Sequence, residues 1–145
     1  MLFGKKKRRI VRLLLVEDEP LIAFDTEHLL REQDYEIVAT VDCVADAVAV
    51  IGDVADIHLV LVDVRLADGS GVDVARAAQG RAIPVIFASG DCPVEAESVG
   101  TGHLAKPYTP RGLLGAINAI EATLEGKSPR RLPTGFRLFE RVSPG

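Results

Sequence analysis

The sequence predicts an α/β domain built on a doubly wound parallel sheet with helices on both faces. Short apolar runs of strand length alternate five times with segments of helical spacing. Most of these runs are continuously apolar rather than alternating, as expected for strands that are covered on both sides. With 145 residues, 48% of them hydrophobic, the chain is long enough for one compact domain and short for two.

The elements follow one another in a regular order. A strand is expected at 10–16, and Pro20 then suits the first turn of a helix that ends before Gln33. Glycines close the next two helices, as is common at helix C-termini. The remaining strands are expected at 37–41, 59–62, 84–88 and, more weakly, 103–105, and the remaining helices at 44–51, 72–79 and about 110–125.

Charge is distributed unevenly along the chain. Residues 13–126 contain twenty acidic and six basic residues, whereas 1–12 contain six basic residues and no acid. The last nineteen residues are also basic. An acidic body argues against direct nucleic-acid binding, which needs clustered Lys and Arg. The basic ends are expected to be solvated or to rest on the acidic body rather than to bind a partner.

Targeting signals are not evident in the sequence. Cys43 and Cys92 form no CxxC pair, which favours a reducing, cytoplasmic compartment. The basic start runs into Glu17 without a cleavage site, so it does not resemble a signal peptide. No segment approaches the roughly 18 apolar residues of a membrane span.

Polar residues follow four of the five predicted strands. Glu17 and Asp18 follow the first, Asp63 the third, Ser89 the fourth and Lys106 the fifth. Because the carboxyl ends of the strands in such a sheet form its functional crevice, we expect these side chains to converge there.

Three carboxylates on one rim repel one another unless a hard cation holds them, and Mg²⁺ prefers such oxygen ligands. A carboxylate can also accept a phosphoryl group when cations neutralise the transferring oxygens. The predicted roles are Asp63 as phosphoryl acceptor and metal ligand, Asp18 as direct metal ligand, Glu17 as ligand through water, the Arg65 backbone carbonyl as a further ligand, Lys106 as fixed cation and Ser89 as hydroxyl donor.

The stretches "LLLVEDEP", "LVLVDVRLADGSG", "VIFASG" and "AKPY" resemble, in order and spacing, the receiver domain of bacterial two-component response regulators. The resemblance covers about 10–125. It implies a flavodoxin-like (CheY-like) five-stranded sheet in the order 2-1-3-4-5 and a cis peptide between Lys106 and Pro107. It also implies that a histidine kinase or phosphotransfer protein phosphorylates Asp63, which switches binding to a downstream protein target.

Several positions depart from the family's pattern. Ala67 replaces a usual proline, and His103 stands where an aromatic switch residue is usual, while Tyr108 follows the Lys-Pro pair. The segment 91–101 leaves room for at most about two helical turns. "VIFASG" without the switch aromatic is similar to the FATGUY subgroup of single-domain receivers, although Ser89 and Asp91 depart from its name motif.

These departures lead to a hypothesis about the readout. Phosphorylation should draw Ser89 and Lys106 inward, and ordering of 91–101, rather than rotation of a ring, is predicted to carry the signal. The alternative for His103 is that it merely fills the surface. The output face is expected to comprise the fourth helix, the fifth strand and the fifth helix.

Outside 10–125 the sequence predicts a basic tail at 1–9 and a tail at 126–145 that is flexible or docks on a partner or on the receiver itself. The second tail is too short for a DNA-binding or enzymatic output domain, which favours a stand-alone receiver. Such a protein catalyses only its own phosphorylation and slow dephosphorylation. The sequence leaves the choice between monomer and dimer open.

Two other functions share features with this pattern. An aspartyl-nucleophile phosphatase requires a second Asp two residues after the first, and Arg65, which occupies that position, cannot exchange a proton near neutral pH. An interaction module that keeps the fold but is not phosphorylated is the other alternative. The presence of all five polar site residues argues against it.

Overall fold

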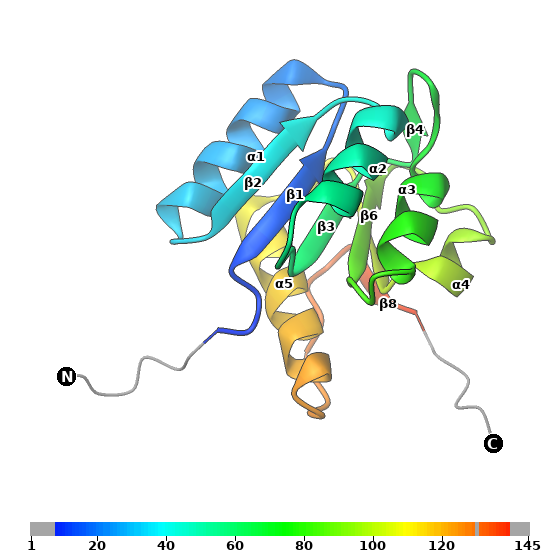
Figure 1. The fold of residues 1–145 in the computed structure, drawn as a ribbon. Helices are drawn as coiled ribbons and strands as arrows, with labels where there is room; N and C mark the ends of the chain where they lie inside the picture. The colour runs from blue at the N-terminus through cyan, green and yellow to red at the C-terminus, as the bar shows by residue number, and fades with distance from the viewer. Residues whose placement is uncertain (1–7, 130, 140–145) are drawn as a thin grey trace.

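A computed structural model describes residues 8–129 and 131–139, and its centre is a sheet of five parallel strands (Figure 1). These strands lie in the spatial order β2-β1-β3-β6-β7, which confirms the predicted 2-1-3-4-5 arrangement. Their bounds are β1 (Arg12–Val16), β2 (Glu36–Val41), β3 (Leu59–Val62), β6 (Val85–Ser89) and β7 (Gly102–Ala105). The predicted fold class is therefore confirmed.

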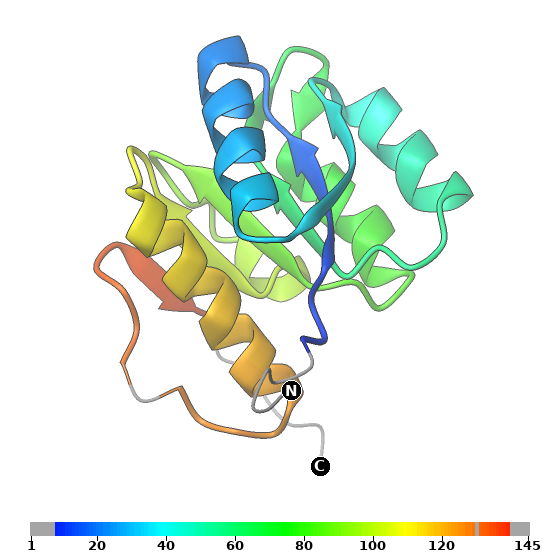
Figure 2. The same ribbon diagram turned by 90° about the vertical axis from the view of Figure 1, so that its left-hand side faces the viewer.

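Helices cover both faces of this sheet (Figures 1 and 2). On one face lie α1 (Pro20–Glu32) and α5 (Pro110–Leu124); on the other lie α2 (Val44–Asp53), α3 (Gly71–Gln79) and α4 (Ala96–Val99). Each face buries its own apolar cluster, one that joins Leu30 of α1 to several residues of α5 and one rich in residues of α2, α3 and α4. All residues of β3 and β6 are buried, which explains their continuous apolar sequences.

The loop after β3 forms a small hairpin of β4 (Arg65–Leu66) and β5 (Gly69–Ser70). Between its strands, the Asp68 carboxylate accepts hydrogen bonds from the amides of Val44 (2.7 Å) and Ala45 (3.0 Å), at the start of α2. These two backbone hydrogen bonds lower the pKa of Asp68. The hairpin is thereby tied to the neighbouring helix, because the carboxylate satisfies amides that have no partner within α2.

A sixth strand, β8 (Phe136–Leu138), pairs antiparallel with β7 at the edge of the sheet. Figure 2 shows the chain passing around α5 before it returns as this strand. Phe136 packs into the cluster of α1 and α5, whereas Phe139 packs into the cluster of α2, α3 and α4. Part of the tail expected to be flexible or docking is therefore docked on the sheet; the boundary proposed at residue 125 stays a prediction.

The described part of the basic N-terminal tail rests on the domain. The Arg8 side chain donates to the Gln33 carbonyl at 2.6 Å and lies 4.3 Å from the Tyr35 ring centroid. The Arg9 amide donates to the Glu121 carboxylate at 3.0 Å. These contacts agree with the expectation that the basic ends rest on the acidic body; the remainder of the 1–9 prediction falls on residues 1–7, outside the described residues.

Gly102 on β7 provides a test of the docked strand. A Cβ atom there would lie 2.7 Å from the Phe136 ring, closer than van der Waals contact allows. We expect Gly102→Ala to destabilise the protein by about 1–3 kcal/mol in urea unfolding, because the overpacked ring must move. The matched control is Gly52→Ala: a Cβ at Gly52 meets nothing within 4 Å, so its stability should be unchanged or higher. Equal stabilities for the two variants would contradict the packing of β8.

Candidate functional site

Asp63 directly follows β3 and is 8% exposed at the carboxyl edge of the sheet. The start of α3 packs against the backbone just behind it: a Cβ at Gly71 would lie 2.1 Å from the Asp63 carbonyl oxygen. Gly71 therefore permits a close approach that any larger residue would prevent. The Arg65 amide donates to Asp63 Oδ1 at 3.1 Å, which fixes the orientation of the carboxylate.

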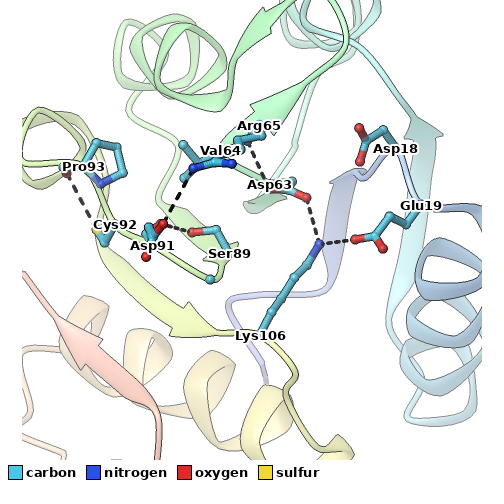
Figure 3. Close-up of a pocket in the computed structure, with 11 residues that line it drawn as sticks. Asp18, Glu19, Asp63, Val64, Arg65, Ser89, Asp91, Cys92, Pro93 and Lys106 are labelled. Carbon is cyan, nitrogen blue, oxygen red and sulfur yellow. Dashed lines mark hydrogen bonds and ion pairs between the residues drawn. The ribbon is translucent and has the colours of Figure 1, made fainter.

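Lys106, which follows β7, brings its ammonium group into the middle of the acidic residues (Figure 3). Its Nζ lies 2.8 Å from Asp63 Oδ2, 2.6 Å from Glu17 Oε1 and 3.2 Å from Glu19 Oε2. The Lys106 and Asp63 side chains are 14% and 11% exposed, so this pair is largely shielded from water. The Lys106–Pro107 peptide is cis, as the resemblance implied.

Burial and charge oppose each other at this cluster. Burial alone lowers the pKa of Lys106, but hydrogen bonds to Asp63 and Glu17 outweigh it, and the pKa is raised. Lys106 is therefore a stable cation at neutral pH. Burial raises the pKa of Glu17, and its hydrogen bond to Lys106 only partly offsets this effect.

Four carboxylates surround a space that suits a hard cation. Ligand atoms of Glu17, Asp18, Glu19 and Asp63 all lie within 4.8 Å of one another. One ammonium group leaves this set strongly negative, and Mg²⁺ prefers such an all-oxygen donor set. The donors present thus fit a divalent cation. Glu19 was not among the predicted site residues. The sequence feature that could have indicated it is its position next to Glu17 and Asp18 in one acidic run.

Ser89, at the end of β6, lies in the same crevice, but its hydroxyl points away from Asp63 (Figure 3). The Ser89 hydroxyl donates to the Asp91 carbonyl and lies 3.2 Å from His103 Nε2. The same imidazole nitrogen lies 3.1 Å from the Ser89 carbonyl oxygen. Because a carbonyl can only accept, Nε2 carries the proton and donates to it.

His103 and Tyr108 therefore occupy different environments. His103 is half-buried and contacts Ser89, so it does more than fill the surface; burial lowers its pKa. Tyr108 instead hydrogen-bonds through its hydroxyl to Thr26 Oγ1 at 2.8 Å, on the side of α1. Of the two candidates for the missing switch aromatic, only His103 touches the predicted hydroxyl donor.

Asp63, Ser89 and Lys106 line a cavity of about 580 Å³. Arg65 and Asp91 form an ion pair at 3.7 Å between the loops that follow β3 and β6. The residues that line the cavity include Asp18, Glu19, Asp63, Arg65, Ser89, Asp91 and Lys106. The structure thus brings together Glu17, Asp18, Asp63 and Lys106 and places Ser89 beside them, while the part of the Arg65 carbonyl as a ligand stays a prediction.

The family model described as "Response regulator receiver domain" matches residues 13–118. The chain belongs to the response regulator receiver family. Receiver domains are signalling modules of two-component systems, and the site described above lies in such a domain. Receiver domains generally bind Mg²⁺ at an acidic pocket, and the carboxylate cluster of this receiver has that character.

Two curated relatives illustrate the similarity. Transcriptional regulatory protein PdtaR of Mycobacterium tuberculosis is 34% identical over 115 residues, which cover 73% of this chain and 54% of that protein. Cell cycle response regulator CtrA of Brucella ovis is 27% identical over 132 residues, covering 86% and 56%. The chain thus spans about half the length of these relatives.

Solved structures show the same fold. The receiver from Methanospirillum hungatei superposes with a TM-score of 0.72 at 24% identity, covering 81% of this chain and 98% of that one. The receiver protein from Sinorhizobium medicae gives a TM-score of 0.66 at 29% identity, covering 75% and 92%. Membership of the FATGUY subgroup stays a prediction. Among the described residues, no helix is long and apolar enough to cross a membrane.

The position of Lys106 leads to a stability prediction. Lys106→Met leaves Asp63 and Glu17 facing each other without their shared cation, so we expect a loss of about 3 kcal/mol in unfolding free energy without added metal. Lys106→Arg keeps the charge and should lose much less. Chemical denaturation at neutral pH measures both; equal stability of Lys106→Met and the wild type would show that the ammonium does not hold these carboxylates together.

Proposed function

We propose that this receiver accepts a phosphoryl group on Asp63 from a histidine kinase or phosphotransfer protein, in a Mg²⁺-dependent reaction that switches binding to a downstream protein. The observation that carries this proposal is the contact of the shielded Asp63 carboxylate with Lys106 inside a four-carboxylate cluster at an open cavity. Neither an acceptor nor a cation alone would suffice, because the transferring oxygens carry charge that must be neutralised.

The contacts of Asp63 suit an acceptor. Oδ1 accepts a hydrogen bond from the Arg65 amide, and Oδ2 accepts one from Lys106 Nζ. These two bonds hold the carboxylate in one orientation. In the proposed transfer a bond forms between an Asp63 oxygen and phosphorus while the bond from phosphorus to the donor imidazole nitrogen breaks, and that nitrogen keeps the electron pair. Lys106 then neutralises a phosphoryl oxygen.

Glu17, Asp18 and Asp63 would hold the metal, with Glu17 acting through water and the Arg65 carbonyl completing the shell. When bound, Mg²⁺ supplies positive charge to the phosphoryl oxygens. Glu19 is a further candidate, because its carboxylate already belongs to the cluster. The carboxylates that surround the acceptor would otherwise repel an incoming phosphoryl group.

Ser89 would change partner on phosphorylation. Its hydroxyl now donates to the Asp91 carbonyl, and the phosphoryl group brings about two negative charges to Asp63. We propose that the hydroxyl then turns toward the phosphoryl oxygens. The Asp91 carbonyl then loses its donor, and we propose that the segment 91–101 adopts a new, ordered conformation that carries the signal.

The rejection of the two alternative functions, the location and the oligomeric state are proposals as well. An aspartyl phosphatase would need an acidic residue at the position of Arg65. An interaction module that is not phosphorylated would not require a cation in contact with Asp63. A cytoplasmic location, the absence of direct nucleic-acid binding and the choice between monomer and dimer are predictions from the sequence. This chain matches about half the length of each of the curated relatives, so the similarity does not extend to the other half.

Incubation with acetyl phosphate and Mg²⁺, followed by intact mass measurement, tests the function. We expect one phosphoryl adduct that is lost in Asp63→Asn and in the presence of EDTA. The matched control Asp53→Asn removes an exposed carboxylate at the end of α2 and should keep the adduct. Rapid turnover of many phosphate esters would favour the phosphatase, and absence of any adduct would favour the interaction module.

Amide exchange with and without beryllofluoride, a phosphoryl analogue, tests the readout. We expect protection within 91–101 to change when the analogue binds, because the hydrogen bond from Ser89 to Asp91 is released. Amides of α2, far along the chain from this segment, serve as an internal reference. Unchanged protection in 91–101 would end the hypothesis that this segment carries the signal.

A further inference from the structure

The strand β8 is a short element held at the edge of β7. Its register pairs Gly102 with Leu138, His103 with Arg137 and Leu104 with Phe136. Two hydrogen bonds flank this ladder: the Ala105 amide donates to Gly135 O at 2.8 Å, and the Phe139 amide donates to Thr101 O at 3.0 Å. Few backbone bonds therefore hold the segment, which is typical of elements that open locally.

The side chains of this segment connect it to α4. Arg137 forms an ion pair with Glu97 of α4 at 3.5 Å, and its guanidinium lies 5.1 Å from the centroid of the Phe139 ring. Phe139 belongs to the same apolar cluster as Ala96 and Val99 of α4. The placement of β8 thus depends on where α4 lies.

The loop that leads into α4 is connected to the site in turn. The Ser89 hydroxyl donates to the Asp91 carbonyl, at the start of the loop that leads into α4. Ser89 also contacts His103, which is the direct cross-strand neighbour of Arg137. Two short routes therefore lead from Ser89 to β8, one through the loop and α4 and one through His103.

We propose that β8 is a releasable strand: phosphorylation of Asp63 weakens its attachment to β7, and the exposed β7 edge then binds an extended partner strand with large apolar residues on both of its faces. This inference rests on the proposed function, because it takes the phosphoryl group on Asp63 as its trigger. It narrows the expected output face to the β7 edge that β8 covers, and it adds the kind of partner that fits there.

The direction of the effect follows from the contacts. When the Ser89 hydroxyl turns to the phosphoryl oxygens, the loop at Asp91 and the ring of His103 each lose one hydrogen-bonding contact. A shift of α4 then removes contacts of Phe139 and separates Glu97 from Arg137. Loss of β8 leaves unpaired amides and carbonyls along β7, which is the requirement for strand addition by another chain.

The side chains of β8, which now occupies the β7 edge, indicate the chemistry of the partner. Phe136 is buried among residues of the α1 and α5 cluster, while Phe139 contacts the ring of Phe87 on the opposite face, with centroids 6.4 Å apart. An entering strand that replaces β8 must fill both places. A strand with aromatic residues three apart, in antiparallel orientation, meets this requirement.

Amide exchange by NMR on the whole chain tests the release. With bound beryllofluoride and Mg²⁺, the Phe139 amide should exchange roughly fivefold faster or more, in line with usual coupling between two sites. The Glu36 amide, which bonds to Val11 O at the opposite edge of the sheet, should be unaffected. Fluorine NMR reports whether the analogue is bound; unchanged Phe139 exchange in a chain with bound analogue overturns the proposal and leaves phosphorylation of Asp63 intact.

A labelled peptide with the sequence of residues 131–139 tests the binding surface. We expect it to bind the full chain at least about fivefold more tightly with beryllofluoride than without it. A peptide with serine in place of both phenylalanines is the control and should not bind. Equal binding in the two states, or binding of the control peptide, overturns the proposal.

Arg137→Ala tests the route through α4. Arg137 is half-exposed, so the variant should fold, and loss of the pair with Glu97 should speed Phe139 exchange about two- to threefold without beryllofluoride. Arg76→Ala removes a similarly exposed pair with Asp73 on α3 and should leave this rate unchanged. Identical Phe139 rates in the two variants would contradict the route.

Discussion

The positive charge of Lys106 among carboxylates is the interaction on which the site depends. Two like charges 4 Å apart repel by about 4 kcal/mol at an effective dielectric constant of 20, so carboxylates crowded at one strand edge need a cation. Lys106 contacts three of them and remains protonated because those contacts outweigh its burial. The negative charge that remains is what makes the cluster suitable for a divalent ion, and with it for phosphoryl chemistry.

The fold supplies this arrangement through its parallel sheet. Strands that are buried on both faces end at a common edge, and the residues that follow them meet there although they are far apart in the chain. Gly71 lets α3 start against the carbonyl of Asp63, which holds the acceptor loop close to the sheet. On the other side of the crevice, Ser89 contacts Asp91, in the loop that leads to α4, and His103 on β7.

Much of this could be predicted from the sequence. The apolar runs predicted the strands to within about two residues. The pattern was clearest for β1, β3 and β6, which are buried along nearly their whole length and are therefore continuously apolar. The polar residues that follow the strands indicated the crevice. The strand β8 could not be predicted, because three residues containing Arg137, preceded by Pro133 and Gly135, carry no strand signal until β7 offers an edge. The contact of His103 with Ser89 and the place of Glu19 likewise depend on side-chain positions that only the folded chain defines.

The claim that these carboxylates are gathered to hold a divalent ion is tested most directly by calorimetric titration of the wild-type chain with Mg²⁺. The account predicts uptake at a single site that is lost when Asp18 is changed to Asn and retained when Asp53, away from the crevice, is changed in the same way. Absence of Mg²⁺ uptake by the wild type, or equal uptake by both variants, would contradict it.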